Sequence, residues 1–285
     1  NSNLLNPNDS YTDEGIGRWH IAKKINDLDI RVGHIYDQIG SGIIYRAFEE
    51  RPLLIDNPLY GVRLIYNLSD DWQLKGFTGR QKFLFSEYSP VVKGATIEGY
   101  LDFSKDGKVF TMAPGLGIVN RTLDDVTMNR VIDIVTTYTA DDRIVPVYNT
   151  YAFSFYNTMV AGPISWYFEA AYKTNEAFFD PQAILTDVNG VESFGKLVKE
   201  SGTVFYSSMS YAKSGLGITL EGKRTENFDY RVDPNLRLNR GLINFIPPMN
   251  RQNTYRLLAR YSPATQLLSE QAFQVDVKKR WSKSL

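Results

Sequence analysis

The sequence predicts an all-β fold, an antiparallel up-and-down transmembrane β-barrel of about 12 strands. Three observations predict it. Apolar and polar residues alternate with a period of two in many segments, short turns join these segments in pairs, and charged residues recur on one face of the strands. We expect residues 1–285 to form a single domain, part of a larger barrel in a longer chain.

Composition narrows the class of protein without deciding it. The 285 residues carry 32 basic and 32 acidic side chains, so the net charge is zero and no nucleic-acid partner is expected. There is no cysteine, which excludes disulfides and thiolate metal sites. Tyrosine (18) and phenylalanine (16) are abundant, as in porins, but the same composition fits a soluble β-sandwich.

Alternation is clearest in three segments, which we expect to be strands with unlike faces. In these segments the apolar members are Ile164, Trp166, Phe168 and Ala170, then Leu216, Ile218 and Leu220, then Phe273, Val275 and Val277. The opposing members are Ser165, Tyr167, Glu169 and Lys173, then Gly217, Thr219, Glu221 and Lys223, then Gln274, Asp276 and Lys278. The same alternation covers residues 96–103 and 18–24.

Short turns join the predicted strands in pairs, and we expect about six such hairpins. Turn residues occur at 25–27, 68–71, 104–107, 213–215 and 262–265. Longer connections are predicted at roughly 37–59, 80–94, 114–146, 174–203 and 225–253. Alternating short and long connections are typical of outer-membrane barrels, where the short turns are periplasmic and the long loops extracellular.

One stretch without charged residues, Ile144 to Phe168, is long enough to span a bilayer as a helix. Pro146, Gly162 and Pro163 interrupt it, and Tyr, Thr and Ser dilute its hydropathy. Two strands around a turn at residues 159–163 account for it better.

The cost of burying charge decides which face would meet lipid. A mid-strand charge facing hydrocarbon costs about 2–4 kcal/mol, so we expect the charged face to line the lumen. Aromatic residues near predicted strand ends are placed for the membrane interface, although a sandwich core is the alternative explanation. These residues are Trp19, Trp72, Trp281, Tyr60 and Tyr66.

Polar residues of a predicted loop and of several strands form the candidate site, a lumen or loop polar network. Its members are Tyr36, Asp37, Arg46, Glu49, Glu50, Arg51, Asp56, Arg63, Lys75, Glu98, Asp102, Glu169, Arg256 and Arg260. Near-equal numbers of acids and bases favour pairs that pin a loop over a ligand site. In a channel, the members on strands would set the electric field felt by a solute.

No catalytic, cofactor or metal site is expected. Gly40-x-Gly42 does not extend to a dinucleotide fingerprint. Only His20 and His34 are available for a zinc site or a catalytic triad. The pairs Asp124-Asp125 and Asp141-Asp142 lie in predicted loops, where solvated charge is a simpler explanation than calcium binding.

A longer motif runs through Tyr36-Asp37-Gln38-Ile39-Gly40-Ser41-Gly42-Ile43-Ile44-Tyr45-Arg46-Ala47-Phe48-Glu49-Glu50-Arg51. It continues through Ile55–Arg63 and Lys75–Gln81. Over about residues 15–82 the chain resembles an uncharacterised family of outer-membrane β-barrel proteins of Bacteroidota, a domain of unknown function. The resemblance implies an envelope location and a barrel fold, usually in a longer chain. It implies neither a substrate nor catalytic residues.

We therefore expect a non-enzymatic barrel of the cell outer membrane, acting as a porin-like channel or as a scaffold for an envelope complex. It would contact membrane lipid and, through its long loops, envelope protein partners. Two other classes remain open at this point. One is a soluble β-sandwich with a binding or adhesin-like role, and the other is an outer-membrane hydrolase, which needs a nucleophile and a base within hydrogen-bond reach.

Overall fold

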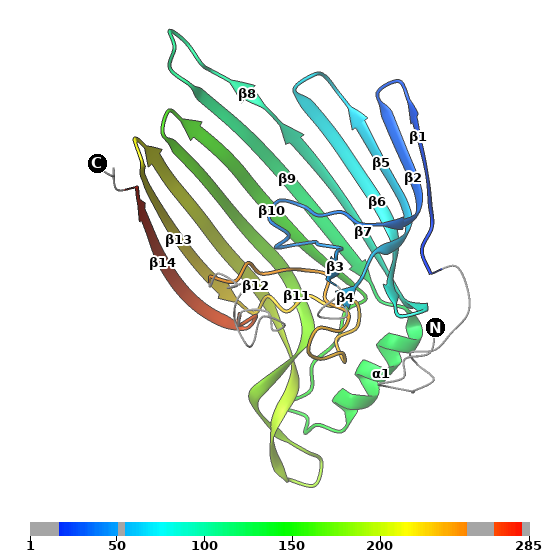
Figure 1. The fold of residues 1–285 in the computed structure, drawn as a ribbon. Helices are drawn as coiled ribbons and strands as arrows, with labels where there is room; N and C mark the ends of the chain where they lie inside the picture. The colour runs from blue at the N-terminus through cyan, green and yellow to red at the C-terminus, as the bar shows by residue number, and fades with distance from the viewer. Residues whose placement is uncertain (1–16, 51–54, 250–264, 281–285) are drawn as a thin grey trace, which may run out of the picture.

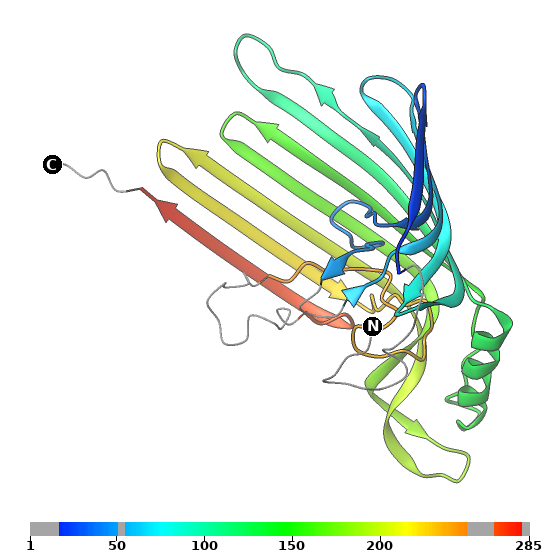
Figure 2. The ribbon, with the colours of Figure 1, turned by 45° about the vertical axis from the view of Figure 1, so that its right-hand side comes forward.

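The computed structural model describes residues 17–50, 55–249 and 265–280. They form a 12-stranded antiparallel sheet that curves into a deep trough. The strands lie side by side in the order of the sequence, so the topology is up-and-down, as Figures 1 and 2 show. The predicted all-β antiparallel meander of about 12 strands is confirmed.

The sheet is built from strands of very different length. In spatial order they are β1 (His20–Ile25), β2 (Leu28–Ile35), β5 (Leu59–Asn67), β6 (Trp72–Phe83), β7 (Ser86–Gly99), β9 (Phe110–Thr122), β10 (Asn149–Ala161), β11 (Ile164–Thr186), β12 (Glu192–Lys213), β13 (Leu216–Glu226) and β14 (Ser269–Lys279). The short β8 (Leu101–Asp102) pairs with β9. A separate two-stranded ribbon joins β3 (Glu49–Glu50) to β4 (Ile55–Asp56).

Two ends of the sheet differ in their connections. At the turn end, uppermost in Figure 1, tight turns join β1 to β2, β5 to β6, β10 to β11 and β12 to β13. Asn26 and Ser214 adopt positive φ there, which a two-residue hairpin requires. At the opposite loop end, long connections join β2 to β5, β9 to β10 and β13 to β14. The predicted turns at 25–27, 68–71, 104–107 and 213–215 lie at the turn end; most of 262–265 falls outside the described residues.

Two of the predicted long connections are wrong. The stretch 80–94 is mostly strand, because β6 and β7 meet in a tight turn at Leu84, which has φ 54°. The stretch 174–203 is a hairpin in which β11 and β12 continue to Thr186 and from Glu192. Register shifts in this hairpin, at Lys173/Glu176 and Asp180/Ile184, break the period-two pattern and hide the strands from the sequence.

The predicted long connection 114–146 is wrong in part, because residues 114–122 belong to β9 and the connection to β10 contains a helix, α1 (Asp125–Thr136). Asp124 caps its N-terminus by accepting hydrogen bonds from the backbone of Val126 and Thr127. Val131 and Val135 pack against Ala177 and Leu197 of the extended β11–β12 hairpin. The β-branched residues of α1 disguise it, since they favour strands. No helix in the described part of the chain is long and apolar enough to cross a membrane.

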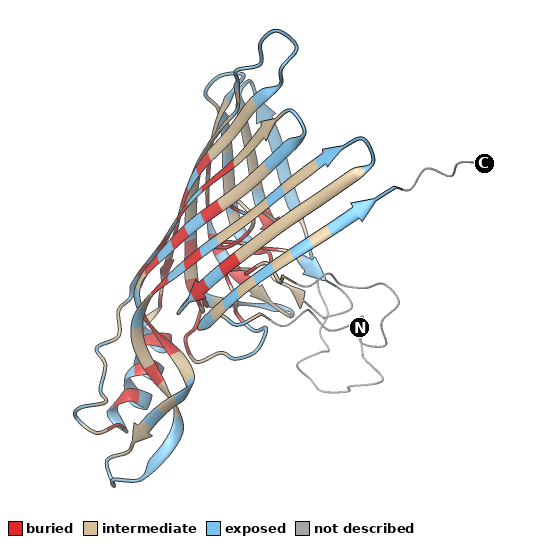
Figure 3. Cartoon of the chain, turned by 90° about the vertical axis from the view of Figure 1, so that its left-hand side faces the viewer, coloured by how far each residue is buried: buried red, intermediate tan, exposed pale blue. Residues whose placement is uncertain are grey.

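The two faces of the sheet carry different side chains, as the alternation predicts. On β11, Glu169 and Lys173 point into the trough and are fully buried, while Tyr172 on the other face is 46% exposed. On β14, Phe273 and Val275 face outward and are 72% and 52% exposed. Figure 3 shows that buried residues concentrate in the half of the sheet toward the loop end. The predicted assignment of charged residues to one face is confirmed for these strands.

The described sheet is open. Among the described residues, β1 pairs only with β2 and β14 pairs only with β13. Residues 144–168 match the prediction of two strands around a turn, because β10 and β11 meet around Gly162, which has φ 55°.

Candidate functional site: the filled interior of the trough

Two connections from the loop end fold back into the trough. We call residues 36–50 the first inner segment and residues 228–249 the second inner segment. Both cross the concave face of the sheet in Figure 2. They contribute apolar side chains to one core with the inward side chains of the strands. From the segments come Ile39, Ile43, Ile44, Tyr45, Ala47, Phe228, Tyr230, Val232, Ile243 and Ile246; from the strands come Leu59, Phe77, Val92, Val119, Ala152, Tyr156, Ala171 and Val204.

The two inner segments also bind each other. The backbone N–H of Arg46 donates to the carbonyl of Ile243 at 2.9 Å, and the N–H of Phe245 donates to the carbonyl of Gly42 at 2.9 Å. The Arg46 guanidinium lies 4.1 Å from the ring centroid of Phe245 and 4.5 Å from that of Phe48. These contacts make the segments one packed unit.

Charged side chains of β5 and β6 hold the start of the first inner segment. Lys75 Nζ lies 2.8 Å from Asp37 Oδ1 and donates to the carbonyl of Gln38 at 2.9 Å. Arg63 Nη1 lies 3.3 Å from the other oxygen of Asp37. Because all three charged side chains are largely buried, loss of one would leave its partners desolvated and unpaired.

Glu169 of β11 holds the middle of the same segment. Its fully buried carboxylate accepts hydrogen bonds from Ser41 N (2.8 Å), Ser41 Oγ (2.6 Å), Ser154 Oγ (2.7 Å) and Tyr167 Oη (2.6 Å). Gly40 makes this approach possible, since its φ is +54° and a Cβ there would lie 2.8 Å from the carboxylate. Four neutral donors therefore solvate a buried anion in place of water.

A buried charge cluster holds the second inner segment. Glu176 of β11 lies between Arg121 Nη2 (2.9 Å) and Lys173 Nζ (2.5 Å), and all three side chains are at most 1% exposed. The two cations also donate to backbone carbonyls of the second segment, Lys173 to that of Asp229 (2.9 Å) and Arg121 to that of Arg231 (3.1 Å). The cluster thus joins the sheet to the segment with charge-assisted hydrogen bonds.

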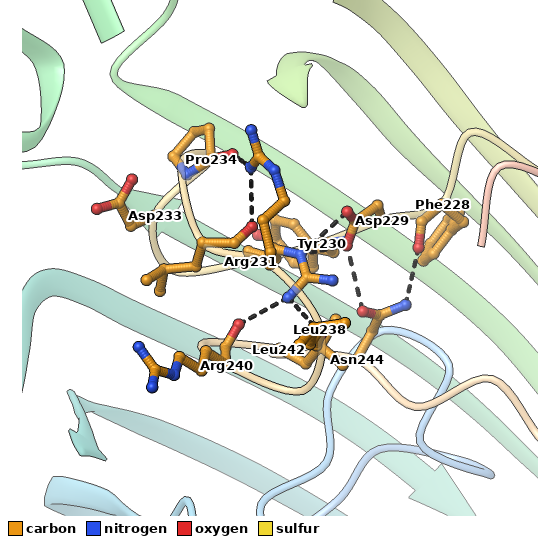
Figure 4. A network of polar contacts seen from close by, with 12 residues as sticks. Phe228, Asp229, Tyr230, Arg231, Asp233, Pro234, Leu238, Arg240, Leu242 and Asn244 are labelled. Atoms are coloured by element: carbon orange, nitrogen blue, oxygen red, sulfur yellow. Dashed lines mark hydrogen bonds and ion pairs between the residues drawn. The ribbon is translucent and has the colours of Figure 1, made fainter. Parts of the chain in front are cut away.

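The second inner segment folds around Arg231, as Figure 4 shows. Arg231 Nε lies 2.8 Å from Asp229 Oδ1, and Arg231 Nη1 donates at 2.7 Å to the carbonyls of Leu238 and Arg240. Asn244 Nδ2 donates to the carbonyl of Phe228 at 2.9 Å. These hydrogen bonds satisfy backbone groups of an irregular segment that lacks the regular hydrogen bonds of a strand or helix.

Further polar side chains from the two flanks of the sheet complete the attachment. Gln81 of β6 donates to the carbonyl of Leu242 at 2.7 Å. Lys223 of β13 donates to the carbonyl of Pro247 at 3.0 Å and lies 3.1 Å from Glu270 of β14. The inner segments are therefore tied to strands spread from β5 to β14.

The structure brings part of the predicted network together. Asp37, Arg46, Arg63, Lys75 and Glu169 meet around the first inner segment, as described above. Near its edges, Tyr36 and Lys82 both bind Asp56, and Arg18 lies 3.0 Å from Glu49. Arg51, Arg256 and Arg260 lie outside the described residues.

Three predicted members lie apart from that cluster. Glu98 accepts a hydrogen bond from Tyr156 (2.6 Å), on the inner face nearer the turn end. Asp102 is exposed in the β7–β9 hairpin and accepts from Ser104 N (2.8 Å). Glu50 is exposed on the β3–β4 ribbon. Among the described residues, these three make no hydrogen bond or ion pair with the cluster around the first inner segment, and their part in a lumen or loop network stays a prediction.

Sequence reasoning missed the Arg121–Lys173–Glu176 cluster. Lys173 was placed on the inner face by alternation, but nothing joined it to Arg121 on β9. Glu176 lies beyond the register shift that follows Lys173, which breaks the alternation that would place it. Only the pairing of β9 with β10 and of β10 with β11 reveals the proximity.

Two of the residues considered for catalysis or metal binding, His34 and Asp142, have structural contacts. The Nδ1 atom of His34 lies 3.2 Å from the backbone N and 3.1 Å from the carbonyl O of Trp19, and its ring packs against Tyr60. Asp142 accepts hydrogen bonds from Lys196 (2.6 Å) and the backbone N–H of Thr186 (2.9 Å), which lower the pKa of its carboxyl. No group of three or more His, Cys, Asp or Glu side chains in the described part is placed to hold a metal ion.

The fold and the interior together define a class: an all-β protein with one curved antiparallel meander whose concave face is filled by its own connections. The chain belongs to the DUF6029 family, described as a family of unknown function, whose model matches residues 1–284. This agrees with the expected family of unknown function; the Bacteroidota origin and the motif stay predictions.

Similarity to other known proteins is slight. No curated protein matches the sequence. Among solved structures, the crystal structure of Pseudomonas aeruginosa OccK8 (OprE) is similar over 73% of this chain, with 11% sequence identity and a TM-score of 0.34. The chain covers 65% of that protein. A TM-score of this size does not establish a shared fold.

Proposed function

We propose that the chain forms the wall of an outer-membrane β-barrel whose interior is filled at the loop end by its own two inner segments. In the membrane this barrel is closed, since a bilayer tolerates no unpaired strand edge. It is a non-enzymatic scaffold of the envelope, embedded in membrane lipid and open to protein partners at its loop end.

The observation that carries this proposal is the distribution of side chains, which is the reverse of that in a water-soluble protein. Charged groups are buried in the concavity, while large apolar side chains cover the convex, outward face. The exposed ones on outward strand positions include Val62, Leu64, Leu74, Leu116, Ile118, Phe153, Phe155, Phe205, Met209, Phe273, Val275 and Val277. A water-soluble protein rarely exposes so large an apolar patch, whereas hydrocarbon stabilises it.

Aromatic side chains border this apolar band on both sides. Toward the turn end, the outward positions carry Tyr66, Trp72, Trp166 and Tyr211; toward the loop end, they carry Tyr60, Tyr151 and Tyr172. Aromatic girdles at both interfaces are typical of membrane barrels. The predicted interfacial residues Tyr60, Tyr66 and Trp72 lie in these rows, and Trp19 packs against Tyr60; Trp281 lies outside the described residues.

The filled interior favours a scaffold over an open channel. The core between the segments and the sheet is fully buried at Ile39, Ile43, Phe228 and Tyr230. The sandwich alternative lacks its second packed sheet among the residues that the structure places, where the other sheet is only the β3–β4 ribbon. The parts free for protein partners are α1 and the β11–β12 hairpin, which project beyond the sheet in Figure 1.

The test has two readouts on the full-length protein. First, unboiled and boiled samples are compared by gel mobility after reconstitution into liposomes; a closed barrel migrates differently before boiling. Second, the same liposomes are fused to a planar bilayer, with protein-free detergent as control. We expect a mobility shift with no steady conductance. Identical mobility and no insertion would overturn the membrane assignment, and reproducible open steps would replace the scaffold by a channel.

A further inference from the structure

Two cations face outward at the loop-end border of the apolar band, on neighbouring strands. Arg80 of β6 lies opposite Val91 of β7, and Lys93 of β7 lies opposite Thr78 of β6. Both side chains are exposed, while their chain neighbours Gln81 and Val92 point into the trough and are buried. Arg80 and Lys93 are therefore diagonal neighbours on one surface, within reach of a single anion.

Neither cation has a partner in the described part of the protein. No ion pair, hydrogen bond or ring contact joins Arg80 or Lys93 to another described residue. By contrast, Arg224, which faces outward on β13, is paired with Glu226. An unpaired charge at the edge of hydrocarbon is costly, so it calls for an anion from the surroundings.

An apolar groove begins one residue pair away, toward the turn end. Gly76 and Ala95 lie opposite each other on the outward face, directly after the Thr78–Lys93 pair. Ala95 lines a shallow depression together with Leu74, Ile97, Leu116, Ile118 and Phe153, and Gly76 lies beside it on the neighbouring strand. A Cβ at Gly76 would meet only the carbonyl oxygen of Gly94, at 3.9 Å, so this space is open.

Neutral polar side chains lie beside the two cations along the same border of the apolar band. Asn120 of β9 lies opposite Lys93 and donates from Nδ2 to the carbonyl of Thr150 (3.3 Å). Thr122 Oγ1 donates to Asn149 Oδ1 at 2.8 Å. Amides and a hydroxyl beside two cations suit a phosphorylated group that carries further hydroxyls or amides.

We propose that this surface binds a phosphorylated, acylated glycolipid of the outer leaflet, with its phosphate between Arg80 and Lys93 and an acyl chain in the groove. The inference rests on the proposed membrane location. The loop end is the extracellular end in such proteins, so the border there faces the outer leaflet. A free phosphate would use the cations and leave the groove unoccupied, whereas the continuity of cations and groove fits an amphiphile.

Native mass spectrometry of the full-length protein, released from mixed vesicles, tests the site. The vesicles contain diphosphoryl lipid A, or its dephosphorylated form, or phosphatidylglycerol. We expect the wild type to retain diphosphoryl lipid A, and the double variant Arg80→Gln/Lys93→Gln to retain at least tenfold less. The matched control, Lys105→Gln/Lys108→Gln, removes two cations at the turn end and is expected to retain the wild-type amount.

A second variant tests the groove without altering charge. Gly76→Leu places an apolar side chain in the open space and is expected to lower lipid A retention while insertion into vesicles is unchanged. Equal retention by wild type, both charge variants and Gly76→Leu would overturn the site. So would equal retention of the dephosphorylated form, or stronger retention of phosphatidylglycerol, which would place the contact with another lipid.

The two proposals fail in distinguishable ways. If the wild type does not insert into vesicles, the membrane assignment fails and the lipid site fails with it. If it inserts, shifts mobility on boiling and retains no lipid A, the site alone is overturned. Binding of inorganic phosphate by wild type in detergent, lost in Arg80→Gln/Lys93→Gln but without lipid A retention, would also reject the glycolipid.

Discussion

Ser41 and Glu169, 128 residues apart in the chain, form a two-point contact in which the backbone N–H and the hydroxyl of Ser41 both donate to one carboxylate oxygen of Glu169. The contact fixes the tip of the first inner segment against the middle of the sheet. The carboxylate is fully buried and accepts hydrogen bonds only from neutral groups. The stability of the fold should therefore depend on its ability to accept all of these hydrogen bonds.

Replacing Glu169 by Gln is expected to lower the free energy of unfolding by about 1–3 kcal/mol, because an amide turns one acceptor oxygen into a donor that faces other donors. Urea-induced unfolding in detergent, followed by tryptophan fluorescence, measures it. Asp102→Asn, at an exposed hairpin, is the control and should change stability little. An unchanged midpoint for Glu169→Gln would contradict the role given to this carboxylate.

Comparing Gly40→Ala with Gly107→Ala separates the cost of a positive φ from the cost of a steric contact with Glu169. Gly40 and Gly107 both have positive φ, but a Cβ at Gly107 meets nothing within 4 Å. The left-handed conformation alone costs a non-glycine residue about 1–2 kcal/mol. We expect Gly107→Ala to show that cost and Gly40→Ala to exceed it, since its Cβ would press on Glu169. The same unfolding assay decides; equal losses would argue against the tight approach.

Glu176→Gln is expected to destabilise the protein by about 3–5 kcal/mol, because it leaves the buried charges of Arg121 and Lys173 without an anion. Glu226→Gln, which breaks the exposed Arg224–Glu226 pair, should change stability little, because water screens that pair. Protease resistance of the second inner segment gives an independent readout, and it should fall for Glu176→Gln only. Similar losses in both variants would contradict the buried cluster as the anchor.

Acid is expected to loosen the contact between the segment that follows α1 and the β11–β12 hairpin. Hydrogen bonds from Lys196 and Thr186 lower the pKa of Asp142, so the ionised form is favoured in the folded state. The contribution is present above the unfolded pKa of about 3.9 and is lost as pH falls through the lower folded value. Hydrogen exchange at the amide of Thr186, which donates to Asp142, should accelerate below about pH 4. Asp142→Asn should exchange rapidly at every pH; an acid response unchanged in that variant would contradict the assignment.

The sheet could be predicted from the sequence where its strands are regular. Strands β10, β11 near Glu169, β13 and β14 follow strict alternation, and turn residues mark their hairpins. The extension of β11 could not be predicted, because the register shifts after Lys173 and Asp180 move side chains between faces. Helix α1 was missed because its packing partners lie on that same extension.

The interior was only partly predictable. The near-equal charges around Asp37 indicated a paired network, and the structure shows Lys75 and Arg63 on it. The second inner segment gave no such signal, since its main partners are backbone carbonyls, such as that of Asp229. A carbonyl acceptor is present at every residue, so sequence cannot mark which ones a buried cation will bind.

The pairing of Gly42 with Phe245 and of Arg46 with Ile243 joins segments from near the two ends of the chain. Contacts between residues so distant in sequence slow folding, because the loop entropy is lost before the contact is gained. The inner segments can pack only after β5, β6, β11 and β13 have paired, since each of these strands supplies a side chain that binds them. The docking of the inner segments should therefore be a late and slow step of folding, and proteases should cut these segments more readily before they dock.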